Sequence, residues 1–271
     1  MTSESIAYAE AMPPEPETVL ITGASSGIGR ELARVFAANG SSLIIVARGK
    51  TKLDELAQEI RTRHGVRVDV IPKDLSQPGA AESLDSDLRA SGLAVDVLVN
   101  NAGFGAHGHF AEIDLERQRE MIQVNVLALT ELTRLLMPAM RRRGRGGILN
   151  VASTAAFQPG PFLAVYYATK AYVLSFSEAL AEELRGEPVT VTCLCPGPTR
   201  TGFAAAAEAV STPLFQRFAG DAPEVALQGY RGFRQRKTVV VVGFLNKLGA
   251  FSTRLAPRWF AARLVRSLHA H

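Results

Sequence analysis

"TVLITGASSGIGR", residues 18–30, joins a short apolar run to three closely spaced glycines. The run has the β-branched composition of a buried strand, and the residues after the glycines have helical periodicity. Gly23, Gly27 and Gly29 would let the backbone turn tightly and approach a pyrophosphate, to which the helix would present its N-terminus. Their spacing is G-x-x-x-G-x-G rather than the common G-x-G-x-x-G. The stretch therefore predicts the first strand, turn and helix of a dinucleotide-binding βαβ unit.

Similar apolar runs recur through the chain, and most of them precede a segment with helical periodicity. The runs span 18–22, 42–47, 66–71, 95–100, 147–152 and 189–195, with a seventh at 238–243. Nearly continuous apolar strands that alternate with helices are typical of a parallel sheet covered on both faces. We therefore predict an α/β fold: a single Rossmann-type, doubly wound parallel sheet of about seven strands with helices on both faces.

Three segments break this alternation, and they set the expected domain limits. Residues 1–17 are predicted to form a flexible N-terminal arm, followed by one domain over 18–243. Within that domain, residues 198–222 form a long insertion after the sixth strand, where a substrate lid is expected. Residues 244–271 form a C-terminal amphipathic extension with arginines at helix-like spacing.

The end of the second strand distinguishes between cofactors. An acidic residue there would bind the ribose 2′-hydroxyl of NAD, but the sequence has Ala47 followed by Arg48. A cation suits a 2′-phosphate, with the Ser25 hydroxyl as a second donor, so we predict NADP(H). Asp74 and Leu75, after the third strand, are expected to contact adenine.

The charge and the few potential metal ligands exclude other classes of protein. The chain of 271 residues has a net charge of +4, yet only 7% of its residues are aromatic, and nucleic-acid binding is not expected. The run Arg141–Arg145 is interpreted as a solvated helix end. Cys193 and Cys195 are expected to pack in the core, and His107 and His109 to border the substrate entrance, so no metal site is predicted.

The sequence gives no sign of export or of a membrane span. The N-terminus lacks the basic and apolar regions of a signal peptide. No uninterrupted apolar run reaches the ~18–20 residues needed to cross a bilayer. We therefore expect a cytoplasmic location, and the C-terminal extension is left with three possible neighbours: a membrane surface, a partner subunit or the substrate cleft.

Three motifs together indicate a family. With "TGASSGIG" near the N-terminus, "NNAG" at 100–103 and "YYATK" at 166–170, the chain resembles the short-chain dehydrogenase/reductases over about residues 18 to 200. The resemblance implies that Tyr166 and Lys170 form the family's Y-x-x-x-K pair. It also implies that Ser153 is the partner serine and that Asn125 holds a proton-relaying water, while Tyr167 is left as a packing or substrate-side aromatic.

The motifs also give the expected cofactor contacts. Residues 101–103 would support the adenine ribose, and the "CPGPTRT" stretch would line the nicotinamide and its phosphates. The full predicted set is Gly23, Ser25, Ser26, Gly27, Ile28, Gly29, Arg48, Asp74, Leu75, Asn101, Ala102, Gly103, Tyr166, Lys170, Pro196, Gly197 and Thr199.

The chemistry expected of such a site is hydride transfer between a nicotinamide and a carbonyl group or secondary alcohol. Tyr166 would protonate the developing alkoxide, Ser153 would orient the carbonyl oxygen, and Lys170 would hold the nicotinamide ribose. Lys170 and the nicotinamide cation are expected to lower the pKa of Tyr166.

A hydrophobic substrate is expected, because the C-terminal extension loosely resembles the branch of steroid and long-chain acyl reductases. The alternatives are a 3-oxoacyl thioester reductase, in which Arg200, Arg217 or Arg234 would dock a carrier, and a catalytically silent NADP(H)-binding protein. The family resemblance further implies a homodimer or homotetramer.

Overall fold

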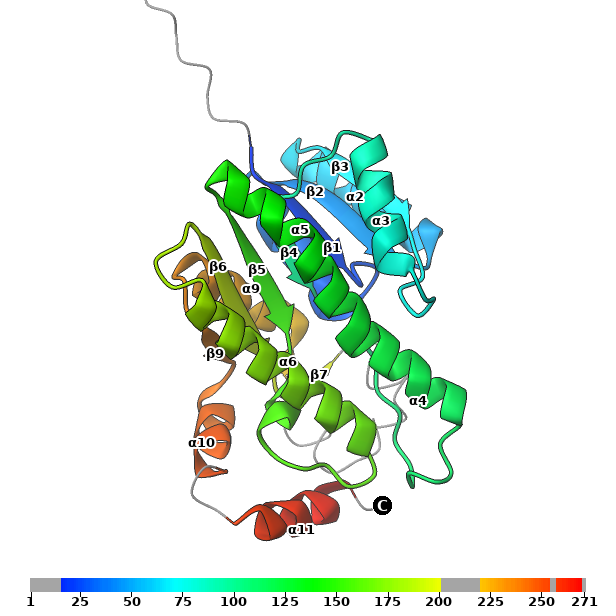
Figure 1. The fold of residues 1–271 in the computed structure, drawn as a ribbon, viewed down its shortest axis with the longest axis vertical. Helices are drawn as coiled ribbons and strands as arrows, with labels where there is room; N and C mark the ends of the chain where they lie inside the picture. The colour runs from blue at the N-terminus through cyan, green and yellow to red at the C-terminus, as the bar shows by residue number, and fades with distance from the viewer. Residues whose placement is uncertain (1–15, 201–219, 254–256, 270–271) are drawn as a thin grey trace, which may run out of the picture.

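The structure is a computed structural model that describes residues 16–200, 220–253 and 257–269. Seven parallel strands form one sheet in the order β3-β2-β1-β4-β5-β6-β9 (Figure 1). The strands are β1 (Thr18–Thr22), β2 (Ser42–Ala47), β3 (Val68–Pro72), β4 (Val97–Asn100), β5 (Gly146–Val151), β6 (Val189–Cys195) and β9 (Val239–Val241). The predicted doubly wound α/β fold is confirmed.

Helices cover both faces of the sheet, and alternate strand residues explain why. Val19 and Ile21 of β1 belong to one core cluster, whereas Leu20 between them belongs to the other. The first cluster packs α1 (Gly27–Ala38), α2 (Lys50–His64) and α9 (Ala222–Arg234). The second packs α3 (Ala80–Ala90), α5 (Leu129–Arg143) and the end of α6 (Ala164–Glu183).

The direction of the strand order reverses between β1 and β4, and this places the site. The chain runs outward from β1 to β3 and then returns to pair β4 with β1, where Ile21 lies opposite Val99. Because all the strands are parallel, the glycine-rich turn after β1 and the segment after β4 emerge at the same edge. That edge is the usual ligand-binding crevice of such sheets.

The long helical segment between β4 and β5 has three parts. It forms α4 (Leu115–Ile122), a π-helical turn η1 (Gln123–Ala128) and then α5. Asp114 caps α4 by accepting a hydrogen bond from the Arg117 amide at 3.0 Å. A π-turn inside an α-helix is rare and often marks a functional residue.

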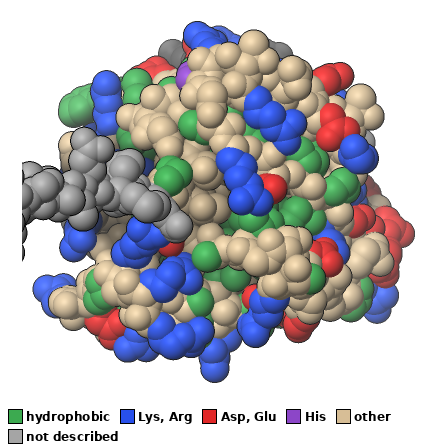
Figure 2. All heavy atoms as spheres, turned by 90° about the horizontal axis from the view of Figure 1, so that it is seen from above, with side chains coloured by type: hydrophobic (Ala, Val, Ile, Leu, Met, Phe, Trp, Pro, Cys, Tyr) green, Lys and Arg blue, Asp and Glu red, His purple; other side chains and the backbone are tan. Residues whose placement is uncertain are grey.

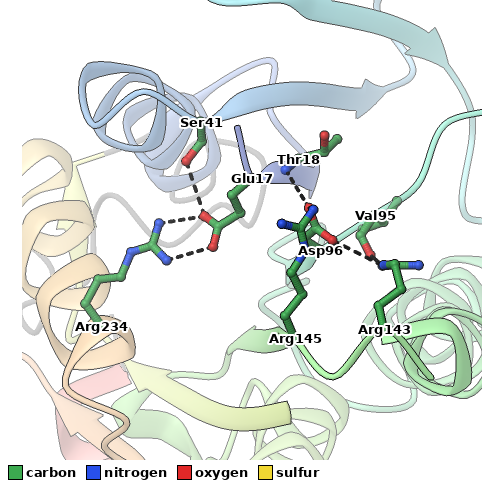
Figure 3. Close-up of polar contacts among 8 residues, drawn as sticks. All are labelled: Glu17, Thr18, Ser41, Val95, Asp96, Arg143, Arg145 and Arg234. Carbon is green, nitrogen blue, oxygen red and sulfur yellow. Dashed lines mark hydrogen bonds and ion pairs between the residues drawn. The ribbon is translucent and has the colours of Figure 1, made fainter. Parts of the chain in front are cut away.

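Arg143 and Arg145, from the predicted solvated run, are ion-paired. Both contact the buried Asp96 carboxylate, with N–O distances of 3.3 and 3.1 Å, and the Thr18 amide donates to the same carboxylate at 3.1 Å (Figure 3). Figure 2 shows that Lys and Arg side chains share this end of the molecule with Asp and Glu side chains. The run therefore fastens α5 and β5 to the starts of β1 and β4.

A second ion pair joins α9 to the residue before β1. Arg234 binds the Glu17 carboxylate through two nitrogens at 2.6 and 2.8 Å, and the Ser41 hydroxyl donates to Glu17 at 3.3 Å (Figure 3). Glu17 raises the pKa of the Arg234 guanidinium further above its ordinary value. This end of the predicted arm is thus held in place, and residues 1–15 lie outside the described residues.

The predicted lid at 198–222 is described only at its ends. β7 (Thr199–Arg200) pairs in parallel with β8 (Gly220–Asp221), and Arg200 forms an ion pair with Asp221 at 3.1 Å. Residues 201–219, which contain the rest of the predicted lid, lie outside the described residues. Among the described segments, no helix is long and apolar enough to cross a membrane.

Candidate active site

A cavity of about 1100 Å³ opens at the carboxyl ends of the strands. It is lined by all of the predicted cofactor residues except Gly29, and by Ser153. Lys52 also lines it, near Arg48, and was not predicted. Their position in the "RGKTK" stretch is the only signal in the sequence that places both cations beside the second strand.

Gly29 has a packing role instead of bordering the cavity. A Cβ atom built on it would lie 2.3 Å from the Asn101 Nδ2 atom and 2.5 Å from the Gly23 oxygen. Gly23 itself has φ +67°, which favours glycine. The turn is closed by Asn101, whose Nδ2 donates to the Thr22 oxygen at 2.9 Å, and by the Thr22 hydroxyl, which accepts from the Ala102 amide at 3.0 Å. The turn after β1 and the segment after β4 therefore form one rigid unit.

Ser153, Tyr166 and Lys170 come together at the middle of the cavity. Ser153 precedes η2 (Thr154–Phe157), a 3₁₀ turn, and its hydroxyl makes a hydrogen bond with Tyr166, which lies in the first turn of α6. One helical turn later, the Lys170 Nζ atom donates to the Val151 oxygen at 2.8 Å and lies 5.8 Å from the centre of the Tyr166 ring. The three predicted residues therefore form one cluster.

Asn125 lies behind this cluster and does not border the cavity. It is part of the π-turn η1, and its Nδ2 donates to the Phe104 oxygen and to the Thr169 hydroxyl, both at 3.0 Å. The Asn125 Oδ1 accepts from the Phe104 amide at 3.1 Å. A Cβ atom on Gly103 would lie 2.9 Å from the Asn125 Oδ1 and 3.4 Å from the Lys170 Nζ. Gly103 thus allows the asparagine and the lysine to approach one another.

Burial dominates the ionisation of Tyr166 and Lys170. It raises the pKa of Tyr166 to about 12, although the hydrogen bond with Ser153 acts in the opposite direction. It lowers the pKa of Lys170 to about 8. In the protein without cofactor, removal of the phenolate from water therefore dominates the Tyr166 pKa, and the expectation that Lys170 and the nicotinamide cation together lower this pKa stays a prediction.

Tyr167 is a packing residue at the edge of the cavity. Its ring is buried in a cluster with Ala155, Leu163 and Val265. A Cβ atom on Gly160 would lie 2.2 Å from ring atoms of Tyr167, so the ring fills the space that this glycine leaves. Burial raises the pKa of Tyr167 above its ordinary value. These contacts support the choice of Tyr166 as the acid.

The C-terminal extension forms one wall of the cavity. It contains α10 (Phe244–Ser252) and α11 (Arg258–His269), which lie at the end of the molecule opposite the start of β1 (Figure 1). Leu245 of α10 and Phe260, Ala261 and Leu264 of α11 line the cavity. Val265 also lines the cavity and is buried in a cluster with Tyr167. Helical periodicity identified an apolar face but not which neighbour it contacts.

His107 and His109 do not line the cavity, contrary to the expectation from the sequence. The His109 ring lies 5.1 Å from the Phe162 ring in an edge-to-face arrangement, and the His107 ring lies 6.0 Å from it. Within the ranges that the structure describes, no three His, Cys, Asp or Glu side chains are grouped as metal ligands. Cys193 and Cys195 are buried on β6, with their sulfur atoms 3.8 Å apart.

The fold and the cavity define a dinucleotide-binding protein of the Rossmann class. A sequence model of the family described as short chain dehydrogenase matches residues 17–211, which is more than half of the chain. The chain therefore belongs to the short-chain dehydrogenase family. Fold, cavity and family agree on a nicotinamide dinucleotide as the cofactor.

Relatives of this chain are named as dehydrogenases and reductases. A very-long-chain 3-oxoacyl-CoA reductase from Phaeosphaeria nodorum is 39% identical over 189 residues, which cover 67% of this chain and 54% of that protein. The chain thus spans about half the length of this curated relative. A short-chain dehydrogenase from Sphingobium yanoikuyae, solved in complex with NADPH, is 33% identical with a TM-score of 0.79, covering 88% of this chain and 93% of the other. One from Burkholderia phymatum, solved with NAD, is 26% identical with a TM-score of 0.78, covering 87% and 92%.

Proposed function

We propose that the protein is an NADPH-dependent oxidoreductase that transfers a hydride between nicotinamide and the carbonyl or secondary alcohol group of a hydrophobic substrate. The proposal rests on one observation: Ser153, Tyr166 and Lys170 lie together in one cavity, and the two ends of that cavity have different linings. One end holds the glycine-rich turn and Arg48, and the other is walled by the apolar side chains of α10 and α11.

The residues of the cluster have complementary roles in such a reaction. When bound, the cofactor supplies or accepts the hydride. In the reduction, the Tyr166 hydroxyl donates a proton to the oxygen of the carbonyl group, and the Ser153 hydroxyl orients that oxygen by hydrogen bonding. Lys170, which is mostly charged below its pKa of about 8, stabilises the phenolate that Tyr166 leaves. Asn125 would connect this ammonium to solvent through a water.

The preference for NADPH rests on the charges at the adenosine end. Arg48 follows Ala47 at the end of β2, and Lys52 lies in the first turn of α2. Both cations line the cavity, and the Ser25 hydroxyl lines it as well. A 2′-phosphate would receive charge-assisted hydrogen bonds there, whereas a 2′-hydroxyl would leave the cations without an anionic partner.

A 3-oxoacyl thioester is the second candidate substrate, and the names of the curated relatives favour it. The docking arginines expected for this function receive less support. Arg234 is paired with Glu17 at the amino end of β1, away from the cavity, and Arg200 is paired with Asp221. Arg217 lies outside the described residues. A catalytically silent protein is disfavoured because Ser153, Tyr166 and Lys170 form a complete cluster.

A homodimer or homotetramer is proposed through the outer face of α4, η1 and α6. Leu115, Ile122, Leu127 and Tyr172 expose large apolar surfaces there. Such a face is typical of a subunit contact. Light scattering of the purified protein would measure its oligomeric state. The cytoplasmic location expected from the sequence stays a prediction.

The function is tested by following NADPH absorbance with aliphatic ketones, aromatic diketones, steroid ketones and 3-oxoacyl thioesters. We expect turnover with at least one apolar ketone, its loss in Tyr166→Phe and its retention in Tyr167→Phe. Loss in Tyr167→Phe together with retention in Tyr166→Phe would overturn the choice of acid. Bound NADPH without any turnover would favour the silent protein.

A further inference from the structure

The two helices α10 and α11 carry the most exposed large apolar side chains among the described residues. Seven of the thirteen exposed large hydrophobic side chains lie on these two helices, and α10 has no buried residue. The seven are Phe244, Leu245, Leu248, Phe251, Trp259, Phe260 and Leu264. We call them the C-terminal patch. Because both helices line the same cavity, this number of exposed apolar side chains on them indicates a surface that contacts something other than water.

The charge of the surrounding chain is entirely of one sign. After Glu224 the sequence contains no Asp or Glu, whereas it contains nine Lys and Arg residues. Lys247, Arg258 and Arg263 are exposed on the two helices beside the C-terminal patch. The Arg263 guanidinium lies 5.2 Å from the centre of the Trp259 ring. Apolar and aromatic side chains in a segment whose only charged side chains are cations match the interface of an anionic bilayer.

The C-terminal patch is continuous with the cavity. Leu245, Phe260 and Leu264 are at least half exposed, and they also line the cavity wall. Next to them on α11, Ala261 and Val265 also line the cavity but are buried, and they hold the helix against the protein. An apolar molecule that reached the outer side of these helices would therefore meet the mouth of the cavity without crossing bulk water.

We propose that α10 and α11 bind the surface of an anionic lipid bilayer and that the cavity takes its substrate from that surface. The second half of this proposal rests on the proposed function, whereas the contact with lipid does not. A second copy of the chain is the competing occupant. It is disfavoured because a two-fold contact would bring the acid-free cationic regions of both copies together.

The experiment measures cosedimentation of the full-length protein with vesicles. One set contains phosphatidylcholine mixed with phosphatidylserine, and the other contains phosphatidylcholine alone. The test variant is Phe251→Ser/Trp259→Ser, because these exposed side chains belong to the C-terminal patch but do not line the cavity. The matched control is Phe110→Ser/Leu227→Ser, which removes two exposed apolar side chains elsewhere.

We expect the wild type and the control to bind the anionic vesicles, and the test variant to bind them at least about tenfold more weakly. Binding should weaken in high salt and on phosphatidylcholine alone. Absence of binding by the wild type would overturn the proposal. So would a smaller assembly of the test variant in light scattering with unchanged vesicle binding, because the patch would then be a contact between copies.

NADPH turnover with a small water-soluble ketone, measured without vesicles, separates this proposal from the proposed function. All three proteins are expected to turn over this ketone equally. A wild type that binds vesicles but turns over none of the tested ketones would support lipid binding while overturning the proposed function. Loading of the substrate from the bilayer is supported if vesicles raise the turnover of a membrane-dissolved ketone by the wild type but not by the test variant. It is refuted if vesicles raise the turnover of both proteins equally.

Discussion

Replacing Lys170 by methionine should stabilise the protein while removing its proposed activity. The side chain is buried, and burial lowers the pKa of its ammonium from 10.5 to about 8. A fall of about 2.5 corresponds to a penalty of about 3 kcal/mol for keeping the charge in the folded protein at neutral pH. Losing the hydrogen bond from Nζ to the Val151 oxygen offsets roughly 1 kcal/mol of this gain. The net gain is about 2 kcal/mol, or roughly 4–8 °C in melting temperature.

The stabilisation predicted for Lys170→Met depends on pH. The lowered pKa means that the penalty is fully present below pH 8, where the lysine is charged in both folded and unfolded chains. It disappears as the pH rises from about 8 to 10.5, because the folded protein then releases its proton first. The advantage of Lys170→Met should therefore be largest at neutral pH and should be lost before pH 10.5, where the missing hydrogen bond to Val151 outweighs the remaining penalty.

Thermal unfolding of both proteins without added cofactor, from pH 7 to pH 10.5, measures this difference. The control is Lys237→Met, which replaces an exposed lysine and should change the melting temperature little at any pH. A Lys170→Met variant that is less stable than the wild type at pH 7 would refute the reasoning. It would mean that the folded protein solvates the ammonium through the Val151 oxygen well enough to remove the penalty of burial.

Three further predictions follow from packing and charge. Gly160→Ala should lose about 1–3 kcal/mol of unfolding free energy and most of the turnover, because its Cβ would lie 2.2 Å from the Tyr167 ring, next to Tyr166. Chemical denaturation measures this loss of stability. The control is Gly249→Ala, which should not show the loss because no atom lies within 4 Å of its Cβ. Arg48→Ala should raise the KM for NADPH by about ten- to a hundredfold and leave the KM for NADH unchanged, and an equal rise in both would contradict a 2′-phosphate contact. Glu131→Gln should have a higher melting temperature than the wild type at pH 7 but not at pH 4. Burial and Glu82 raise the pKa of Glu131, so its ionisation destabilises the fold as the pH rises. Equal melting temperatures at pH 7 would show that Glu131 ionises without a cost in stability.

Local patterns were enough to predict the sheet, and the family's motifs predicted the candidate cluster of Ser153, Tyr166 and Lys170. The apolar runs placed all seven strands, because strands buried on both faces have few polar residues. The Y-x-x-x-K spacing brought Tyr166 and Lys170 to one side of α6, since residues four apart are neighbours on a helix. These features depend on short-range geometry, which the sequence contains directly.

Features that depend on distant partners could not be predicted in this way. Arg143 and Arg145 resemble solvated cations in the sequence, and only the parallel register places Asp96 beside them. Gly29 has the spacing of a cofactor contact, but the Asn101 side chain already occupies the space beside it. The period of α11 likewise gave an apolar face without showing that Val265 would point toward Tyr167.

The π-turn η1 has a consequence for how this helix tolerates insertions and deletions. Each residue of an α-helix turns the following side chains by about 100°, so a π-turn works as a single extra residue that changes the phase between α4 and α5. Deleting one residue within 123–128 would let the two helices merge into one regular α-helix. The core side chains of α5 would then keep their contacts with the sheet only if α4 rotated, and Asn125 would turn away from Phe104. A single codon therefore separates two registers of this helix, and only the present one directs the Asn125 side chain toward Phe104 and Thr169.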